Sequence, residues 1–473
     1  MHRHRLKDLQ KWLLRPGRKP LILRGARQVG KSTLVRLFCE AASDRDLLTV
    51  NLERHPQLAE TFARNDPATV LDVIEAVSDR PRSEHTILFL DEIQAAPSAF
   101  ASLRYFLEEM PELPIVAAGS LMEFMLSDHT FSMPVGRIQY LDLGPMTFTE
   151  FLRAAGQERL AREIETIEWK GAAPPSPHPV VHRRLLELVR LYHVVGGMPE
   201  AVKVYAESRN LRAVSAVHAS IIDTWRDDFP KYAARRDLTR MLRVFNFAAR
   251  QAGRKVKYSN VSPDDQSATI RRDIDLLAMA RVIARVTHSQ CTGLPLQADL
   301  KEKVFKLIFL DVGLMNAVCG LGWQTIAGQT ATQLVNAGPG AEQFIGQHLQ
   351  FLLADRPNRE LTYWLREGRS NNAEVDYVCE LGGRIVPIEV KAGRTGTLKS
   401  LHQFVAEKRV PFAVRFDTDL PALHTVEAEV RHGHGSERIR YPLLSLPLYL
   451  VERLPCMVEG LADSLMAGGT MNP

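Results

Sequence analysis

The sequence predicts an α/β protein of three parts: a parallel sheet first, a mostly helical middle, and a second α/β part toward the carboxyl end. Three observations carry this expectation. Short apolar runs alternate with helical patterns over the first third, amphipathic helices dominate from about 180 to 325, and strand-like runs return after about 360. A chain of 473 residues is also long enough for about three domains.

The composition is that of an ordinary globular chain. Apolar residues make up 45 % and charged residues 24 %, which excludes a disordered or collagen-like chain. A net charge of +5 permits nucleic acid as a partner without requiring it. The five cysteines are scattered and form no C-x-x-C pair, which favours a reducing, cytoplasmic location and argues against structural zinc. The basic start lacks an apolar signal core, and no run of 18 apolar residues predicts a membrane span.

The first expected domain covers residues 1–170. Strand-like runs at 21–25, 47–53, 86–93 and 114–120 are apolar almost throughout, and helical patterns lie between them. Continuous apolar strands that alternate with helices are typical of a buried parallel sheet covered on both faces.

A phosphate-binding motif, G-x-x-x-x-G-K-[ST], follows the first of these runs. Its residues are Gly25, Ala26, Arg27, Gln28, Val29, Gly30, Lys31 and Ser32, with Thr33 next in the helix. The glycines let backbone N–H groups face a β-phosphate, and the helix amino end adds favourable partial charge. Lys31 is expected to contact the β- and γ-phosphates and Ser32 to ligate Mg²⁺. The alternative is a glycine-containing turn with an incidental lysine.

Two further strand ends point to the same chemistry. The run Ile87–Leu90 ends in Asp91 and Glu92, where Asp91 is expected to hold the Mg²⁺ shell and Glu92 to polarise the attacking water. The alternative for Glu92 is a solvated acid. Ser120 ends the next strand, and its hydroxyl either senses the γ-phosphate or caps a helix.

Together, these features resemble an AAA-type ATPase core. The stretches GARQVGKSTL, ILFLDEIQ, GRIQYLDLGPMTFTEFL, VVGGMPEAV, LDVGLMNAV and VDYV with PIEVKAG resemble the bacterial and archaeal family that joins an AAA domain to a DUF4143 domain. The resemblance implies ATP and Mg²⁺ as cofactors. It also places Arg137 where a cation could reach the γ-phosphate, in cis or in a neighbouring subunit, so a homo-oligomer is one option.

The middle domain is expected at 180–330. Near its end, a helix, a short turn, a second helix and a strand pair follow the order of a winged helix-turn-helix. Nine basic residues fall between 231 and 258 against one acid, Asp237. This run is either a solvated face or a surface for nucleic acid, with DNA the form expected. The candidate phosphate contacts are Arg236, Arg240, Arg243, Arg271 and Arg272.

The last domain is expected at 336–455 as a separate α/β unit. Asp376 lies in one strand, and Glu389 and Lys391 share a face of another, so two carboxylates and an ammonium converge. With Glu342 in the preceding helix, the pattern looks like the PD-(D/E)xK signature, which implies a restriction-endonuclease-like fold. Glu342, Asp376 and Glu389 would ligate a divalent metal, and Lys391 would orient water. The alternative is a solvated ion pair.

Two functional hypotheses follow. In the first, the chain hydrolyses ATP, contacts DNA through the winged-helix region, and binds or cuts it with the last domain. In the second, it is an ATP-dependent switch or scaffold whose nuclease-like domain is an inactive interaction module.

Overall fold

The computed structural model describes residues 2–42, 44–120, 134–171, 173–231, 237–321, 338–355, 360–367, 372–391, 398–432 and 435–467. The chain divides into two compact units. The first comprises Met1–Met146 with Asp275–Val282, and the second comprises Thr147–Ile274 with Ile283–Pro473. Within the described ranges, no helix combines the length and apolar character that a membrane span needs.

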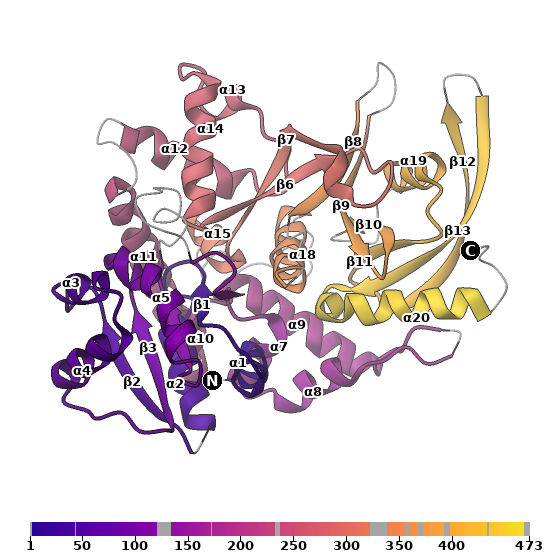
Figure 1. Cartoon of the computed structure of the whole chain (residues 1–473). Helices are drawn as coiled ribbons and strands as arrows, with labels where there is room; N and C mark the ends of the chain where they lie inside the picture. The colour runs from indigo at the N-terminus through magenta and orange to yellow at the C-terminus, as the bar shows by residue number, and fades with distance from the viewer. Residues whose placement is uncertain are drawn as a thin grey trace. The chain divides into compact units, whose positions relative to one another are not determined.

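The first unit is built on a five-stranded parallel sheet in the order β2-β3-β4-β1-β5 (Figure 1). Its core is a cluster of apolar side chains from the strands and from helices α3, α4 and α5. The elements are α1 (Arg5–Leu14), β1 (Leu21–Arg24), α2 (Lys31–Ala41), β2 (Asp46–Asn51), α3 (Leu58–Ala63), α4 (Pro67–Ser78), β3 (Thr86–Asp91), α5 (Pro97–Glu109), β4 (Ile115–Ala118) and β5 (Gln139–Asp142).

This strand order decides which loops become neighbours. Strand β4 lies between β1 and β3, with Ala118 in register with both Leu23 and Asp91. The carboxyl ends of parallel strands meet at one edge of a sheet, which is where α/β proteins bind ligands. The phosphate-binding motif after β1, the acids ending β3 and Ser120 beyond β4 therefore share that edge.

The second unit begins with helices that pack around a buried aromatic cluster. Tyr192 contacts Phe148, Phe151 and Phe344 edge to face, with ring centroids 5.3–5.9 Å apart. Thr147 and Glu150 form a capping box at the start of the first of these helices. The helices are α7 (Phe148–Ala154), α8 (Glu158–Thr166), α9 (Pro179–Val195), α10 (Pro199–Ser208), α11 (Leu211–Asp228), α12 (Leu238–Arg250), α13 (Tyr258–Val261), α15 (Val312–Val318), α18 (Gly338–Leu352), α19 (Lys399–Lys408) and α20 (Leu454–Ala467). Helix α14 (Ser267–Met279) begins in this unit, and its residues from Asp275 on are assigned to the first.

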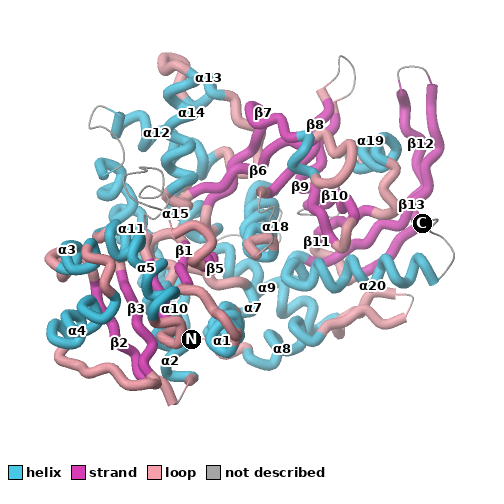
Figure 2. The backbone as a smooth tube through the Cα atoms, in the orientation of Figure 1, coloured by secondary structure: helices cyan, strands magenta, loops and turns pink. Residues whose placement is uncertain are grey.

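The remaining strands form one eight-stranded mixed sheet, drawn in magenta in Figure 2, in the order β12-β13-β11-β10-β9-β8-β6-β7. Helices α18 and α19 pack on it. Its strands are β6 (Ile283–Ser289), β7 (Leu300–Phe309), β8 (Leu361–Arg366), β9 (Ala373–Leu381), β10 (Arg384–Val390), β11 (Ala413–Asp417), β12 (Ala422–His432) and β13 (Gly435–Pro447). The expected order of a parallel sheet, a mostly helical middle and a second α/β part toward the carboxyl end is confirmed, and the sheet of that last part is mixed.

The hairpin β6–β7 differs from the expectation of a separate last unit. It follows the middle helices in sequence, but β6 pairs in parallel with β8, from Val286 opposite Leu361 to His288 opposite Tyr363. The sheet is therefore continuous across the expected boundary between the second and third domains. This pairing brings side chains of β7 to the expected nuclease-like site.

The motif segments VVGGMPEAV and LDVGLMNAV meet in the second unit. Gly196, at φ +70, ends α9, and a Cβ there would lie 2.1 Å from the Asp311 carboxylate. Asp311 is buried and accepts hydrogen bonds from the backbone N–H groups of Gly197 (2.6 Å) and Leu314 (3.0 Å). The turn at Gly196 is thus structural.

Candidate functional site

The phosphate-binding loop joins β1 to α2 in the first unit. Gly30 occupies the left-handed region at φ +91 before the helix, and a Cβ on Gly25 would lie 2.2 Å from the carbonyl oxygen of Leu143. Both glycines are therefore required by the backbone geometry. Lys31 is buried, and its Nζ donates to the carbonyl oxygens of Gly25 and Ala26 at 2.9 Å each. The lysine ammonium thus lies over the loop that would wrap a phosphate.

Ser32 and Asp91 lie side by side, as predicted. The Ser32 hydroxyl is 3.1 Å from both carboxylate oxygens of Asp91. Burial, and then the neighbouring charge of Glu92, raise the pKa of Asp91, while the hydrogen bond from Ser32 lowers it. A hydroxyl and a carboxylate beside a phosphate loop are the hard oxygen donors that Mg²⁺ prefers, so these residues fit that ion.

Glu92 is held in an uncommon backbone conformation directly after Asp91. Its φ is +52, in the left-handed region, and Gln94 donates a hydrogen bond to its Oε2 at 2.5 Å. Non-glycine residues adopt this region rarely, and such residues are frequent at functional sites. The contact with Gln94 fixes where the carboxylate points.

Ser120 lies just beyond β4, between the phosphate loop and the acids of β3. Its side chain is 5 % exposed, and its Oγ has no hydrogen-bond partner among the residues that the structure describes. A buried hydroxyl without a partner is costly unless something binds it. Its position fits the predicted contact with a γ-phosphate.

Arg137 does not lie near the phosphate loop. It precedes β5, whose Gln139 is in register with Leu21 at the amino end of β1, whereas the loop follows the carboxyl end. Its side chain is about half exposed and pairs with Glu108 at 3.2 Å. The position gives no support to action in cis. Action in a neighbouring subunit, and with it a homo-oligomer, stays a prediction.

Arg3 is a neighbour of the loop that the sequence patterns did not indicate. Its guanidinium donates to the carbonyl oxygens of Val29 (2.9 Å) and Gly144 (2.7 Å), and only 6 % of the residue is exposed. It therefore ties the phosphate loop to the segment after β5. A lone arginine in a basic amino-terminal run carries no signal for such a contact.

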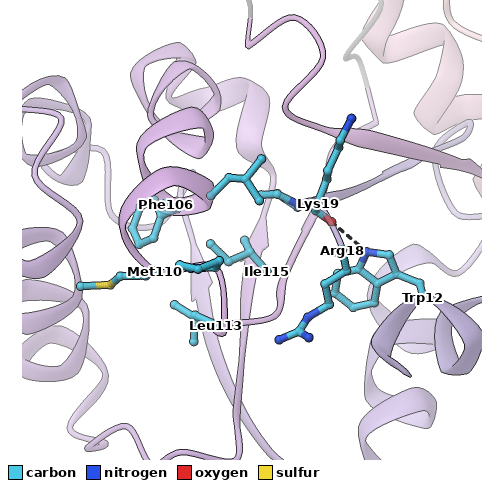
Figure 3. A pocket seen from close by; sticks show the side chains of 10 residues that line it. Trp12, Arg18, Lys19, Phe106, Met110, Leu113 and Ile115 are labelled. Carbon is cyan, nitrogen blue, oxygen red and sulfur yellow. Dashed lines mark hydrogen bonds between the residues drawn. The ribbon is translucent and has the colours of Figure 1, made fainter. Parts of the chain in front are cut away.

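A cavity in the first unit lies away from this site (Figure 3). Its lining includes Trp12, Pro20, Phe106 and Ile115, at the amino ends of β1 and β4. Its volume is about 10 Å³, which is the space of one water molecule. It is too small and at the wrong edge of the sheet to hold a nucleotide.

The predicted nucleic-acid contacts that the structure describes differ in how exposed their side chains are. Arg236 lies outside the described residues. Arg240 is not available for phosphate, because its guanidinium donates hydrogen bonds to the buried Asp273 at 2.6 and 3.2 Å and to Asp237 at 3.1 Å. This contradicts its predicted role: the residue joins α12 to α14 and has a side chain only 13 % exposed. Arg243 and Arg271 are about half exposed, with weaker contacts to Asp265 and Glu302, and Arg272 is exposed.

The predicted carboxylates of the second unit do converge. Asp376 on β9 lies beside Glu389 on β10, because Tyr377 and Ile388 are in register on these antiparallel strands. Asp376 accepts a hydrogen bond from the backbone N–H of Val390 at 2.7 Å, and Glu389 pairs with Lys391. Burial, followed by the nearby charge of Asp376, raises the pKa of Glu389. Burial also raises the pKa of Glu342, and Lys306 opposes that shift.

The sequence patterns missed the lysine at the centre of this cluster. Lys306 of β7 is fully buried, and its Nζ lies 2.9 Å from Glu342, 2.5 Å from Glu374 and 3.8 Å from Asp376. The one feature of the sequence that could have indicated it is a single lysine within the otherwise apolar run Val304–Phe309.

The residues present do not fit the divalent metal predicted for this cluster. Within the described ranges, no group of three or more His, Cys, Asp and Glu side chains is arranged to hold a metal ion. Glu342, Asp376 and Glu389 are not assembled as one ligand set, since the first two face an ammonium and the third pairs with Lys391. The predicted metal-ligating role of these three residues is therefore corrected to ion pairing.

Among curated proteins, the chain is similar to two mycobacterial ones. "Uncharacterized protein Rv2008c" of Mycobacterium tuberculosis and "Uncharacterized protein Mb2031c" of Mycobacterium bovis are each 24 % identical over 391 residues. These alignments cover 80 % of this chain and 70 % of each relative.

Among solved structures, two of the most similar come from Aeropyrum pernix and Thermotoga maritima. The Aeropyrum pernix ORC2 protein has a TM-score of 0.34 at 13 % identity, covering 69 % of this chain and 96 % of the other. The Thermotoga maritima RuvB Holliday junction branch migration motor has a TM-score of 0.28 at 14 % identity, covering 60 % and 90 %. At such scores, neither their domain arrangement nor their function carries over.

Three family models match consecutive parts of the chain. Residues 17–152 match an AAA domain, residues 186–325 a domain of unknown function (DUF8612), and residues 337–420 a domain of unknown function (DUF4143). The first match covers the five-stranded parallel sheet and its phosphate loop. The chain therefore carries an AAA domain on its amino-terminal side and a DUF4143 domain toward its carboxyl end.

Proposed function

We propose that the first unit binds ATP with Mg²⁺ and hydrolyses it. One observation carries this proposal: the Ser32 hydroxyl lies 3.1 Å from both oxygens of Asp91, directly beside the buried Lys31 of the phosphate loop. Lys31 and Ser32 open helix α2, whereas Asp91 ends strand β3, far away in sequence. Their meeting at the carboxyl edge of the sheet supplies a cation for phosphate and hard oxygens for Mg²⁺ together.

The other residues at this edge have separate roles in the proposal. The backbone of Gly25 to Gly30 surrounds the phosphates, and Lys31 neutralises their charge. Glu92, oriented by Gln94, accepts a proton from the attacking water. Ser120 offers its hydroxyl to the γ-phosphate. Mg²⁺ supplies charge neutralisation when bound, held through Ser32 and Asp91.

The change Lys31→Ala tests nucleotide binding. We expect ATP affinity to fall by at least about 10-fold, because a charged hydrogen bond to phosphate is worth about 1.5–3 kcal/mol. Titration with a fluorescent ATP analogue measures the change. Lys19→Ala is the matched control, since Lys19 is exposed at the opposite edge of the same sheet. Equal affinity in the parent and in Lys31→Ala would reject the proposed site.

A second function, nucleic-acid binding by the second unit, is supported by the order of its elements. After α12, Lys255 forms a β-bridge with Lys306, and α13, α14, β6 and β7 follow. Gly253 and Val256 donate backbone hydrogen bonds to Leu307 and Phe305 at 2.9 Å each, so this segment runs beside β7 through an isolated bridge. Helices followed by such a hairpin have the order expected of a winged helix-turn-helix.

Three of the exposed cations of this region are the proposed phosphate contacts: Arg272 on α14, and Lys301 and Lys303 on β7. The double change Arg272→Glu with Lys303→Glu should weaken DNA binding across all sequences and reduce the salt slope by about one per lost contact. Fluorescence anisotropy at several salt concentrations measures both. Arg438→Glu, an exposed position on β13, is the control for charge reversal. Unchanged binding would favour the alternative of an ATP-dependent switch or scaffold without a nucleic-acid partner.

A further inference from the structure

The acidic cluster of the second unit is built around the ammonium of Lys306. Three carboxylates surround it, from Glu342 on α18 and from Glu374 and Asp376 on β9. The aromatic ring of Tyr363 lies on another side, with its centroid 5.0 Å from Nζ. Lysine is almost never fully buried unless it is paired, so this environment is specific to a cation.

We propose that Lys306 is a built-in counter-ion that takes the place of a divalent cation in this cluster, so that the DUF4143 domain holds no metal there and cleaves no phosphodiester. The proposal is independent of ATP hydrolysis, because every residue it uses lies in the second unit.

Each carboxylate around Lys306 already has at least one oxygen in a hydrogen bond or ion pair. Glu342 and Glu374 each turn an oxygen to Lys306 at 2.9 and 2.5 Å. Asp376 gives one oxygen to the backbone of Val390 at 2.7 Å and turns the other toward the same ammonium. A magnesium ion would need these oxygens at about 2.0–2.1 Å in a near-octahedral shell. The ammonium lies within the space that such a shell would take.

The neighbouring backbone leaves the cluster little freedom to rearrange. A Cβ on Gly253, at φ +77, would lie 2.7 Å from the Glu342 carboxylate, so that acid packs directly on the chain. Lys306 itself is fixed in β7 by its bridge with Lys255. Because its Nζ lies within 3 Å of two carboxylate oxygens, Lys306 is paired as an ammonium, and a metal would have to displace that cation.

Metal binding by the full chain without nucleotide tests the proposal, with Mn²⁺ as the probe. Calorimetric titration and the Mn²⁺ resonance signal are compared in the parent, Asp376→Asn, Lys306→Met, and Lys306→Met with Asp376→Asn. We expect the parent and Asp376→Asn to bind Mn²⁺ alike. Lys306→Met should gain one site, at least about tenfold tighter than any Mn²⁺ binding to the parent cluster, and the double variant should lose it. Mn²⁺ should also raise the melting temperature of Lys306→Met but not of the parent.

Two results would overturn the proposal. One is a Mn²⁺ site in the parent that Asp376→Asn removes. The other is a folded Lys306→Met protein, judged by circular dichroism, that gains no site. If Lys306→Met does not fold, the comparison of the parent with Asp376→Asn still shows whether the parent cluster binds Mn²⁺. Metal-dependent nicking of supercoiled DNA by the parent, above the Asp376→Asn background, would also reject it.

Discussion

Glu92→Gln is expected to leave ATP binding intact and to slow hydrolysis at least about 100-fold, which is the lower range of what a positioned general base contributes. The amide keeps the size and shape of the carboxylate but cannot accept a proton from water. Gln94, which donates to Glu92 Oε2, can still hydrogen-bond the amide oxygen. The site should therefore keep its geometry and lose its base. Steady-state phosphate release gives the rate, and titration with a fluorescent ATP analogue gives the affinity.

The control is a carboxylate at the opposite edge of the same sheet. Glu108→Gln removes the partner of Arg137 and should hydrolyse ATP at the parent rate if Arg137 has no cis role. Hydrolysis by Glu92→Gln at the parent rate would remove Glu92 from the proposed chemistry. If both variants lose activity while binding ATP normally, the pair of Arg137 and Glu108 belongs to the reaction, with a neighbouring subunit as its most direct explanation.

The nucleotide site was predictable because its signals are local. Gly25, Gly30, Lys31 and Ser32 form one continuous motif whose spacing is dictated by how a loop wraps a phosphate. Asp91 ends an apolar strand, and parallel strands bring such ends to one edge of the sheet. Arg3 was missed there, because its contacts with the carbonyl oxygens of Val29 and Gly144 leave no periodic pattern in the sequence.

The acidic cluster was predictable only in part, because a partner from another segment changes its chemistry. Residue spacing correctly brought Asp376 beside Glu389 on neighbouring strands. Residue spacing could not predict that Lys306 joins the cluster, because β7 reaches it only through the parallel pairing of β6 with β8. Pairing of distant strands depends on the whole sheet and not on any local window. The sequence therefore predicts a metal site where the folded chain forms a cluster of ion pairs around Lys306.

The basic run in the middle of the chain shows the same limit for surface charges. Counting cations cannot separate an arginine that faces solvent from one that faces a buried acid. Arg240 and Arg243 lie three residues apart on α12, yet the first is 13 % exposed and the second 52 %. The difference arises from Asp273, a buried carboxylate on α14 that only the packed helices place beside Arg240.

Arg240→Ala is expected to destabilise the packing of α12 against α14 by about 3–5 kcal/mol, the cost of leaving one partner of a buried ion pair alone. Asp273 has a side chain only 1 % exposed, and burial already raises its pKa even though Arg240 lowers it. Without the guanidinium, the carboxylate must take up a proton or break open the helix contact. Amide hydrogen exchange in α12 and α14 should become at least about 100-fold faster.

Two further variants separate packing from charge. Arg243→Ala removes an equal charge from the same helix at an exposed position and should change exchange little. Replacing the pair together, as Arg240→Met with Asp273→Leu, should recover most of the protection, because no buried charge is then left alone. If Arg240→Ala instead leaves exchange unchanged and weakens DNA binding, its ion pair with Asp273 is not what holds the helices, and its original assignment as a phosphate contact returns.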